Sequence, residues 1–332
     1  MGKPRRRPAT ATIYDVAAAA RVSPRTVSRY FNHPGKLAAS TCQELARVVA
    51  RLGFRPSAVA NRLSNRAQDT LAVLATIGED EPLSELHRLL LGHIAADLAR
   101  HGKDLLLVGI TPGNEERVVA EHLRRRKSEA LLLLTSVSRR ILEEITATGL
   151  PTVTVNWRPG RALPANRYVG IDYTASSREF ADALLHRGRR LAWVAPPGEM
   201  GERGRAALDA AAAVHVDCVA VEFAGGADLA ASADDTVRRL LAWSGQPLLA
   251  YCCSDRLALA LLAAMQRAGR RVPDDLGIAG FDGLEAGANV HPVLTTVEQP
   301  WRGMAGAAAA CLLGAGSGDI VLPTRIRWGG SC

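Results

Sequence analysis

The sequence predicts a small helix-turn-helix head followed by an α/β core of two doubly wound subdomains. The prediction rests on a basic first segment, on short amphipathic helices within that segment, and on two later series of buried strands alternating with helices. The chain has 332 residues, of which 48% are hydrophobic, so it is long enough for two or three domains with sizeable cores. This composition excludes a wholly disordered chain.

Charge is distributed unevenly along the chain. Residues 1–66 contain 13 Lys and Arg against 2 acidic residues, a net charge of +11, whereas the remaining 266 residues contain 28 basic and 31 acidic residues, a net charge of −3. A small basic head on a mildly acidic body indicates a nucleic-acid-binding module joined to a second functional unit.

Several classes of protein are disfavoured by the same inspection. No apolar run approaches the roughly 18 residues of a membrane span, and charged residues interrupt the stretch after Arg5-Arg6-Arg7 where a signal peptide needs an apolar core. We therefore expect a cytoplasmic protein with no membrane partner. The six cysteines are scattered without metal-binding spacing, so reduced thiols are expected, and no metal or other cofactor.

Helix start and stop signals define the head. Thr12 and Asp15 form a capping-box pattern before a first helix, and a turn then leads to a second helix that Ser23 caps, with Pro24 in its first turn. A third helix is expected over residues 40–52, ending at Gly53. This order of elements predicts a helix-turn-helix with a supporting third helix.

Three blocks follow one another in the head: Thr12-Ile13-x-Asp15-Val16-Ala17, Val22-Ser23-x-x-Thr26-Val27-Ser28-Arg29 and Gly53-Phe54-x-Pro56-Ser57-Ala58-x-Ala60. Their order and spacing resemble the DNA-binding headpiece of the LacI/GalR family of bacterial transcriptional regulators. There are two departures from the family pattern, since Arg21 stands in the turn where Gly or Asn is usual, and Ala38 replaces the usual serine cap of the third helix.

The second helix carries the candidate DNA-reading residues. Arg25 and Arg29 lie on successive turns of one face, and an arginine fork suits the O6 and N7 atoms of guanine in the major groove. The resemblance implies that Pro24 is a third base-contacting position and assigns Ser23, Thr26 and Ser28 to capping, packing and phosphate contacts. The alternative is that the arginines bind phosphates, which receive most protein–DNA hydrogen bonds.

Residues 57–68 form an expected hinge and linker. Its helical part is too short to be stable in isolation and is expected to fold on DNA. The resemblance implies that this hinge helix pairs with that of a dimer mate in the minor groove, where Leu63 wedges into a base step and Ala60 faces the groove floor. The alternative for Leu63 is packing between domains.

The body reads as repeated strand–helix units. A first series of apolar runs predicts strands at 71–77, 104–110, 130–135 and 152–155, and a second series predicts strands at 191–195, 216–223, 248–251 and 277–280. Helical patterns separate them. Two doubly wound subdomains are therefore expected, with a ligand in the crevice at the carboxyl ends of the strands.

Further blocks are found in the body: Ser254-Asp255-Arg256-x-Ala258, Arg271-Val272-Pro273-Asp274-Asp275-Leu276, Gly280-Phe281-Asp282 and Leu294-Thr295-Thr296-Val297-x-Gln299-Pro300. They continue the LacI/GalR resemblance and imply a periplasmic-binding-protein-like core in which the chain crosses between subdomains three times. The expected domains are a headpiece at 10–56, the hinge and linker at 57–68, an N-terminal core subdomain at 69–162 and 296–317, and a C-terminal core subdomain at 163–295 and 318–332.

Where body motifs match, the resemblance also implies five effector-binding residues, namely Asn156, Arg203, Ser254, Asp282 and Trp301, with the neighbouring Arg205 as the alternative to Arg203. An amide, a guanidinium, a hydroxyl, an acid and an indole suit a polyhydroxyl or heterocyclic ligand through paired hydrogen bonds and ring stacking. Each also has an ordinary structural alternative, such as a helix surface, a turn or a subdomain interface. Residues 79–83 only faintly echo the family's Asn-Pro-Phe-Phe wall, which keeps open a family member without a small effector.

The resulting functional prediction is a sequence-specific transcriptional regulator, expected to be a repressor. It would bind a palindromic double-stranded DNA operator as a homodimer and respond to a small-molecule effector such as a sugar or related metabolite. An enzyme is disfavoured because nucleotide-binding, metalloprotease and serine-hydrolase motifs are absent from the sequence. A solute-binding protein would share the body but lack residues 12–63.

Overall fold

The structure is a computed structural model and describes residues 11–32, 35, 37–54, 69–78, 83–158, 166–187, 190–224, 228–243, 248–315 and 318–332. The chain divides into two units, Met1–Gln68 and Asp69–Cys332, which we call the head and the core. The predicted hinge at 57–68, including Ala60 and Leu63, lies outside the described residues.

The head contains the three expected helices, α1 (Ile13–Ala19), α2 (Pro24–Asn32) and α3 (Ala39–Leu52). Their boundaries follow the predicted signals, because Thr12 and Asp15 form the capping box of α1 and Gly53 ends α3 with a left-handed φ of 59°. Val16, Val27 and Leu45 are fully buried and hold one helix each against the others. The two departures from the family pattern are visible in the backbone. Ala38 gives α3 no side-chain cap, and Arg21 has a left-handed φ of 55°.

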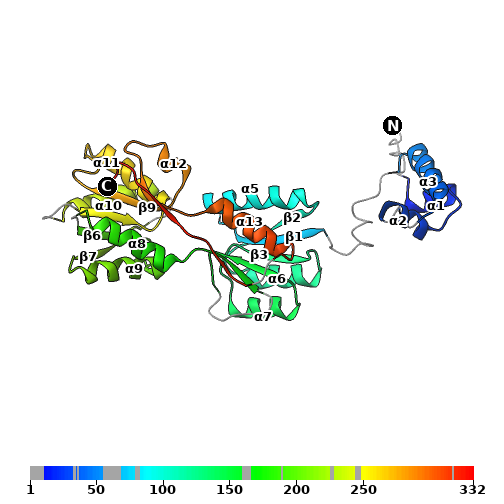
Figure 1. Ribbon diagram of the computed structural model, residues 1–332, viewed down its shortest axis with the longest axis horizontal. Helices are drawn as coiled ribbons and strands as arrows, with labels where there is room; N and C mark the ends of the chain where they lie inside the picture. The colour runs from blue at the N-terminus through cyan, green and yellow to red at the C-terminus, as the bar shows by residue number, and fades with distance from the viewer. Residues whose placement is uncertain are drawn as a thin grey trace, which may run out of the picture. The chain divides into compact units, whose positions relative to one another are not determined.

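The first sheet of the core is entirely parallel, with the strand order β11-β5-β4-β3-β1-β2. Its strands are β1 (Thr70–Thr76), β2 (Asp104–Ile110), β3 (Ala130–Leu133), β4 (Thr152–Val155), β5 (Asn166–Gly170) and β11 (Ile320–Val321). The helices that cover it are α5 (Glu85–Arg100), α6 (Glu115–Arg124), α7 (Arg139–Ala147) and α13 (Trp301–Leu312). Figure 1 shows α5 and α13 lying side by side on this sheet.

Alternation along β1 explains why this sheet is covered on both faces. Leu71 and Val73 belong to the cluster that contains Ile94 of α5, whereas Ala72 and Leu74 belong to a second cluster with residues of α6 and α7. Successive side chains of a strand point to opposite faces, so a strand that is apolar at every position must be buried on both sides. The continuous apolar runs of the sequence therefore indicate strands that are buried on both faces.

The second sheet has the order β12-β10-β9-β8-β6-β7 and is parallel except for β12. Its strands are β6 (Arg190–Ala195), β7 (Cys218–Glu222), β8 (Leu248–Cys252), β9 (Gly277–Asp282), β10 (Thr295–Glu298) and β12 (Arg325–Arg327). The remaining helices are α8 (Tyr173–Leu185), α9 (Gly201–Ala213), α10 (Leu229–Leu241), α11 (Asp255–Arg267) and α12 (Glu285–Ala288). The predicted arrangement of two α/β subdomains is confirmed.

Strand pairing places the subdomain boundaries differently from the expected residue numbers. β5 pairs with β4, so the first subdomain continues past residue 162, and β11 joins β5 in the same sheet although residues 318–332 were assigned to the second subdomain. β10 pairs with β9, so residues 296–298 belong to the second sheet. These strands are short, and only their long-range pairing identifies their sheet. The chain does return to the first subdomain after Gln299, in line with the assignment of residues up to 317 to that subdomain, because α13 packs on α5, β3, β4 and β5.

None of the described helices is both long and apolar enough to cross a membrane.

Candidate functional site

The exposed face of α2 presents the candidate DNA-reading side chains to solvent. Pro24, Arg25 and Arg29 are all exposed, and the two arginines are four residues apart, so they project from the same side of the helix. Among the described residues, neither guanidinium has a hydrogen-bond or ion-pair partner. Both therefore keep their five N–H donors for a ligand.

The neighbouring polar residues are engaged in holding α2 in place. The Ser23 hydroxyl accepts a hydrogen bond from the Thr26 amide at 3.1 Å and lies 2.9 Å from the Thr26 hydroxyl, which confirms the predicted cap. Ser28 is half-buried.

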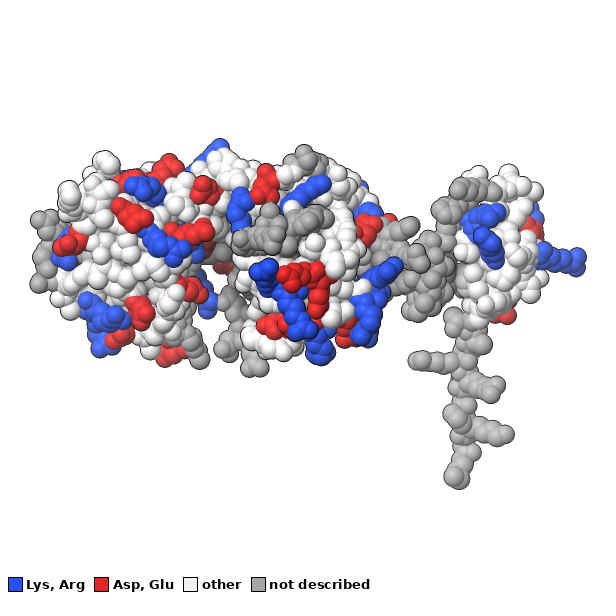
Figure 2. Space-filling model, turned by 90° about the horizontal axis from the view of Figure 1, so that it is seen from below, with Lys and Arg blue, Asp and Glu red and all other residues white. Residues whose placement is uncertain are grey.

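Neither described acid of the head opposes the arginines, because Asp15 accepts hydrogen bonds from Thr12 and Glu44 pairs with Arg47 at 3.2 Å. Figure 2 shows basic side chains standing out from the surface of this unit.

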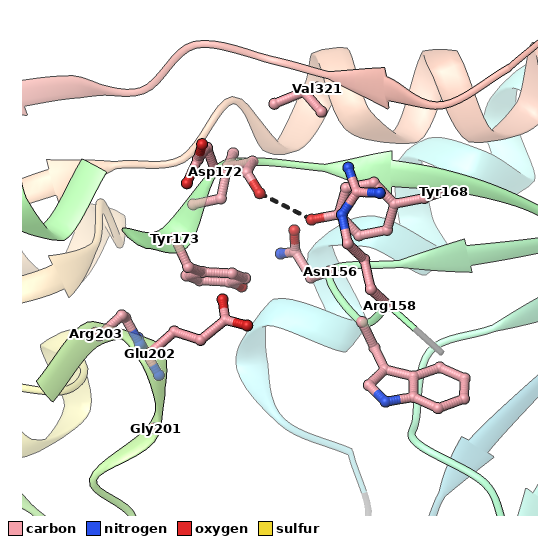
Figure 3. Close-up of a pocket in the computed structure, with 11 residues that line it drawn as sticks. Asn156, Arg158, Tyr168, Asp172, Tyr173, Gly201, Glu202, Arg203 and Val321 are labelled. Atoms are coloured by element: carbon pink, nitrogen blue, oxygen red, sulfur yellow. Dashed lines mark hydrogen bonds between the residues drawn. The ribbon is translucent and has the colours of Figure 1, made fainter. Parts of the chain in front are cut away.

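In the core, residues at and after the carboxyl ends of β4 and β5, together with the first turn of α9, surround a cavity of about 490 Å³. Residues of the first subdomain and its connections supply one side, and the start of α9 supplies the other (Figure 3). The lining residues are Asn156, Trp157, Arg158, Tyr168, Ile171, Asp172, Tyr173, Gly201, Glu202, Arg203 and Val321. The volume and the mixture of aromatic and polar groups suit a small organic ligand.

A second cavity, of about 340 Å³, shares Asn156, Trp157 and Tyr173 with the first. The beginning of α5, the loop after β3 and Trp301 at the start of α13 complete its lining. Asn156 follows β4 directly and has a φ of 56°, a conformation that asparagine tolerates better than most residues. The two cavities therefore meet at a strand end, as the sequence predicted.

Arg203 is held in a fixed orientation at the edge of the first cavity. Its Nη1 donates to the carbonyl oxygen of Cys253, and its guanidinium carbon lies 5.2 Å from the centre of the Tyr173 ring and 5.0 Å from that of Phe281. Gly204 allows this placement, because a Cβ there would lie 2.7 Å from Nε1 of the buried Trp193. The stacked guanidinium keeps further N–H groups available for a ligand.

A chain of side-chain hydrogen bonds joins the two subdomains beside the cavities. Asn156 Nδ2 donates to Gln299 Oε1 at 2.9 Å, and Gln299 Nε2 donates to Asp282 Oδ1 at 2.9 Å. Trp301 Nε1 also donates to the main-chain oxygen of Asp282 at 2.8 Å. Because Gln299 lies between β10 and α13, at one of the crossings, this relay links the end of β4 to the end of β9.

Burial controls the ionisation of Asp282. This carboxyl is 4% exposed, and its burial, reinforced by the charge of Asp255, raises its pKa to about 7, although the Arg203 guanidinium opposes the rise. Asp282 therefore gains or loses its proton near physiological pH.

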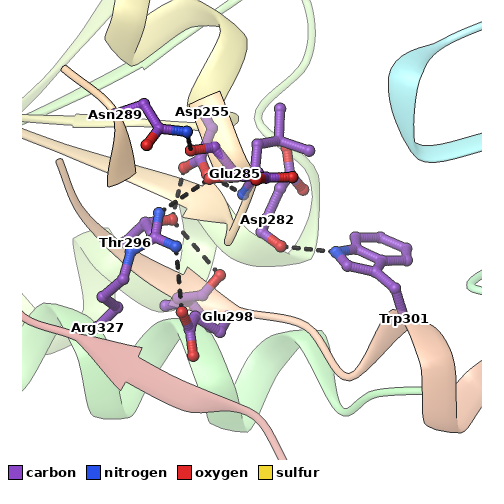
Figure 4. Close-up of polar contacts among 10 residues, drawn as sticks. Asp255, Asp282, Glu285, Asn289, Thr296, Glu298, Trp301 and Arg327 are labelled. Atoms are coloured by element: carbon purple, nitrogen blue, oxygen red, sulfur yellow. Dashed lines mark hydrogen bonds and ion pairs between the residues drawn. The ribbon is translucent and has the colours of Figure 1, made fainter. Parts of the chain in front are cut away.

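A second polar cluster fixes the turn that follows Asp282 (Figure 4). Asp255 is completely buried, and its carboxylate accepts hydrogen bonds from the Leu284 amide at 2.7 Å and from the Thr296 hydroxyl. Arg327 donates to the Leu284 carbonyl oxygen at 3.0 Å and to Glu298 at 3.1 Å. Burial raises the pKa of Asp255, and the hydrogen bonds partly offset that rise. The cluster ties β9, β10, β12 and α11 together behind the relay.

The five residues predicted to bind an effector have different positions. Asn156 lines both cavities, Arg203 lines the first, and Trp301 lines the second. Asp282 lines neither and instead bonds to Gln299, while the Ser254 hydroxyl accepts from the Leu257 amide at 3.3 Å as the N-cap of α11.

The prediction missed several cavity residues, notably Trp157, Arg158, Tyr168, Tyr173 and Glu202. Trp157 and Arg158 directly follow Asn156, so extending the strand-end criterion by two positions finds them. Tyr168 lies on β5, a strand that the apolar pattern did not reveal because its first residues are Asn166 and Arg167. Tyr173 and Glu202 reach the cavity through tertiary packing.

Known protein families match parts of both the head and the core. Residues 12–57 match the family described as bacterial regulatory proteins, lacI family, and residues 181–332 match the periplasmic binding protein-like domain. The chain is 28% identical to the HTH-type transcriptional regulator CelR of Thermobifida fusca over 97% of this chain and 96% of that protein. It is also 28% identical to the HTH-type transcriptional repressor PurR of Vibrio campbellii over 88% of each.

Solved structures share the fold over nearly the whole chain. The Lac repressor dimer bound to operator and the anti-inducer ONPF has a TM-score of 0.79 at 19% identity, covering 97% of this chain and 98% of that one. The CelR–cellobiose complex has a TM-score of 0.66 at 24% identity, covering 97% of this chain and all of that one. The chain therefore carries a lacI-family DNA-binding domain, with an exposed arginine pair on its second helix, followed in the sequence by a periplasmic-binding-protein-like domain.

Proposed function

We propose that this protein is a repressor that binds a palindromic DNA operator as a homodimer in the cytoplasm, and that a small polyhydroxyl effector in the core modulates this binding. The observation that carries the proposal is the pairing of an unopposed arginine face on α2 with a ligand-sized cavity between the core subdomains. Relatives named as repressors, PurR and the ribose operon repressor of Haemophilus influenzae, support the direction of regulation.

DNA recognition is assigned to α2. Arg25 and Arg29 would reach base edges in the major groove, Pro24 would offer an apolar surface, and the Ser23–Thr26 cap and Ser28 would lie near phosphates. Ala60 and Leu63 stay proposed as the minor-groove contacts of a hinge helix that orders on DNA. A twofold dimer reads two equivalent half-sites, hence the palindrome.

Effector binding is assigned to the two cavities that share Asn156, Trp157 and Tyr173. Arg203 supplies oriented donors, and the rings of Tyr173, Trp157 and Trp301 supply flat apolar faces that suit the carbon face of a sugar. Ser254 and Asp282 would support this site from behind, through the start of α11 and the relay. A ligand that binds the open and closed arrangements of the subdomains unequally would shift the dimer between DNA-binding states.

The competing function is a LacI-family regulator without a small effector. It would be favoured by a cleft that side chains pack shut. The cavities of about 490 and 340 Å³ support the effector-binding alternative instead.

The test begins with operator selection from a random DNA pool, followed by calorimetry with neutral sugars, sugar derivatives, nucleosides and purines. Arg203→Ala is expected to abolish the response to any active compound while operator affinity without ligand stays nearly unchanged. Arg205→Ala is the matched control, because Arg205 is exposed on the same helix and does not line the cavity. Equal losses in both variants, or no heat from any compound, would refute the effector assignment.

A further inference from the structure

The first cavity is lined by four charged side chains, and three of them are already engaged within the fold. Arg158 pairs with Asp319 at 2.6 Å and lies 3.8 Å over the Tyr168 ring. Asp172 accepts from the Ala175 amide at 2.9 Å as the N-cap of α8. Arg203 donates to the Cys253 carbonyl oxygen.

Glu202 is different. It lies in the first turn of α9, is exposed, and has no hydrogen-bond or ion-pair partner among the described residues. Figure 3 shows its carboxylate directed into the cavity, toward Tyr173 and Asn156. Both carboxylate oxygens of Glu202 therefore remain free to accept hydrogen bonds from a ligand in the cavity.

The charges around the cavity determine how the Glu202 carboxylate acts on a charged ligand. Asp319 compensates Arg158, and Arg203 can compensate only one of the remaining carboxylates, Asp172 and Glu202. The four charged lining side chains sum to zero, and with Asp319, the partner of Arg158, the group of five carries one net negative charge. A ligand that carries a carboxylate or phosphate would bring a like charge toward Glu202, whereas hydroxyl or ammonium groups would donate to it.

We infer that Glu202 sets the charge class of the effector, accepting hydrogen bonds from a neutral or amine-bearing polyhydroxyl ligand and excluding acidic ligands of the same shape. The inference rests on the proposed effector site and deepens it. It also separates the roles of neighbouring residues: Arg203 orients the ligand through its donors, and Glu202 selects among ligands through its charge.

The probes are two matched series, in which glucose, glucosamine and glucuronate are compared with galactose, galactosamine and galacturonate. Calorimetry and thermal shift on the full chain give an affinity ranking for each series. The wild-type protein is expected to bind the amino sugar or the neutral sugar more tightly than the acid in at least one series. Glu202→Gln keeps the size and an acceptor oxygen but removes the charge, so the ratio of amine to acid affinity should fall by about tenfold or more.

Glu199→Gln is the matched control, because it makes the same charge change three residues earlier, at an exposed position that does not line the cavity. It should keep the wild-type ranking. A wild-type preference for the acids, or an unchanged ranking in Glu202→Gln, would overturn the inference while leaving the effector site in place. No wild-type response to any of the six probes, in protein that still binds its selected operator, would overturn both this inference and the proposed polyhydroxyl effector.

Discussion

The arginine pair of the head and the hydrogen-bonded relay of the core present their polar side chains in opposite ways. Arg25 and Arg29 extend into solvent from one short helix and have no partner among the described residues. Asn156, Gln299 and Asp282 come from distant parts of the chain and are bonded to one another. A surface that binds a large polyanion needs free charges on a local scaffold, whereas a small-ligand site needs polar groups whose orientation the fold has already fixed.

The largest effect is expected from the head. Arg29→Ala should weaken specific operator binding by about 2 to 6 kcal/mol, because a dimer loses one base contact of about 1 to 3 kcal/mol in each half-site. Binding should be titrated on selected and random DNA at one salt concentration. Arg51→Ala, an exposed change at the end of α3, controls for the loss of positive charge. Equal weakening on both DNAs would show that Arg29 contacts phosphate.

In the core, the largest loss of stability is expected when a buried acid is substituted. Asp255→Ala removes the acceptor of the Leu284 amide and of the Thr296 hydroxyl, and should lower the free energy of unfolding by about 2 to 4 kcal/mol. All five tryptophans, Trp157, Trp193, Trp243, Trp301 and Trp328, lie in the core, so tryptophan fluorescence during urea unfolding reports on that unit.

An exposed acid of the head, Glu44, provides the contrasting case. Glu44→Ala removes an ion pair that lies in solvent and should change stability by less than about 1 kcal/mol, measured through hydrogen exchange of α3. Similar losses from both substitutions would contradict the contrast between buried and exposed acids.

A pH-dependent difference should distinguish Asp282 from every exposed acid. Its pKa of about 7 in the folded core exceeds the ordinary value of 3.8, so the folded state binds more protons between these values and stability falls as pH rises. From pH 5 to 8 the wild-type core should lose about 2 to 3 kcal/mol relative to Asp282→Asn, which cannot ionise. Parallel stability profiles of the two proteins would show that burial does not hold the proton on Asp282.

The smallest effect concerns a missing cap in the head. Ala38→Ser should stabilise α3 by about 1 kcal/mol, because Ala38 is in the extended conformation of an N-cap but offers no acceptor to the first amides. Hydrogen exchange of the α3 amides in the full chain measures the gain. Ala39→Ser places the same hydroxyl one residue inside the helix, where it should give no such protection.

The sequence was most informative where structure depends on near neighbours. Thr12 with Asp15, Ser23 with Thr26, and Gly53 mark helix ends through contacts within a few residues, so the three described helices of the head could be predicted from the sequence. Long apolar runs likewise revealed the central strands of both sheets, because a strand buried on two faces cannot carry polar residues.

By itself, the sequence determined a basic helix-turn-helix, two α/β subdomains and a crevice at the carboxyl ends of their strands, and the family resemblance added Asn156 and Arg203 as candidate residues of that crevice. Only the tertiary structure placed β5, β10 and β11 in their sheets, placed Asp282 behind Gln299, and brought Tyr168, Tyr173 and Glu202 to the cavity. The physical reason is range: caps and apolar periodicity are set over a few residues, whereas a relay that joins residues 156 and 299 depends on how two whole sheets pack.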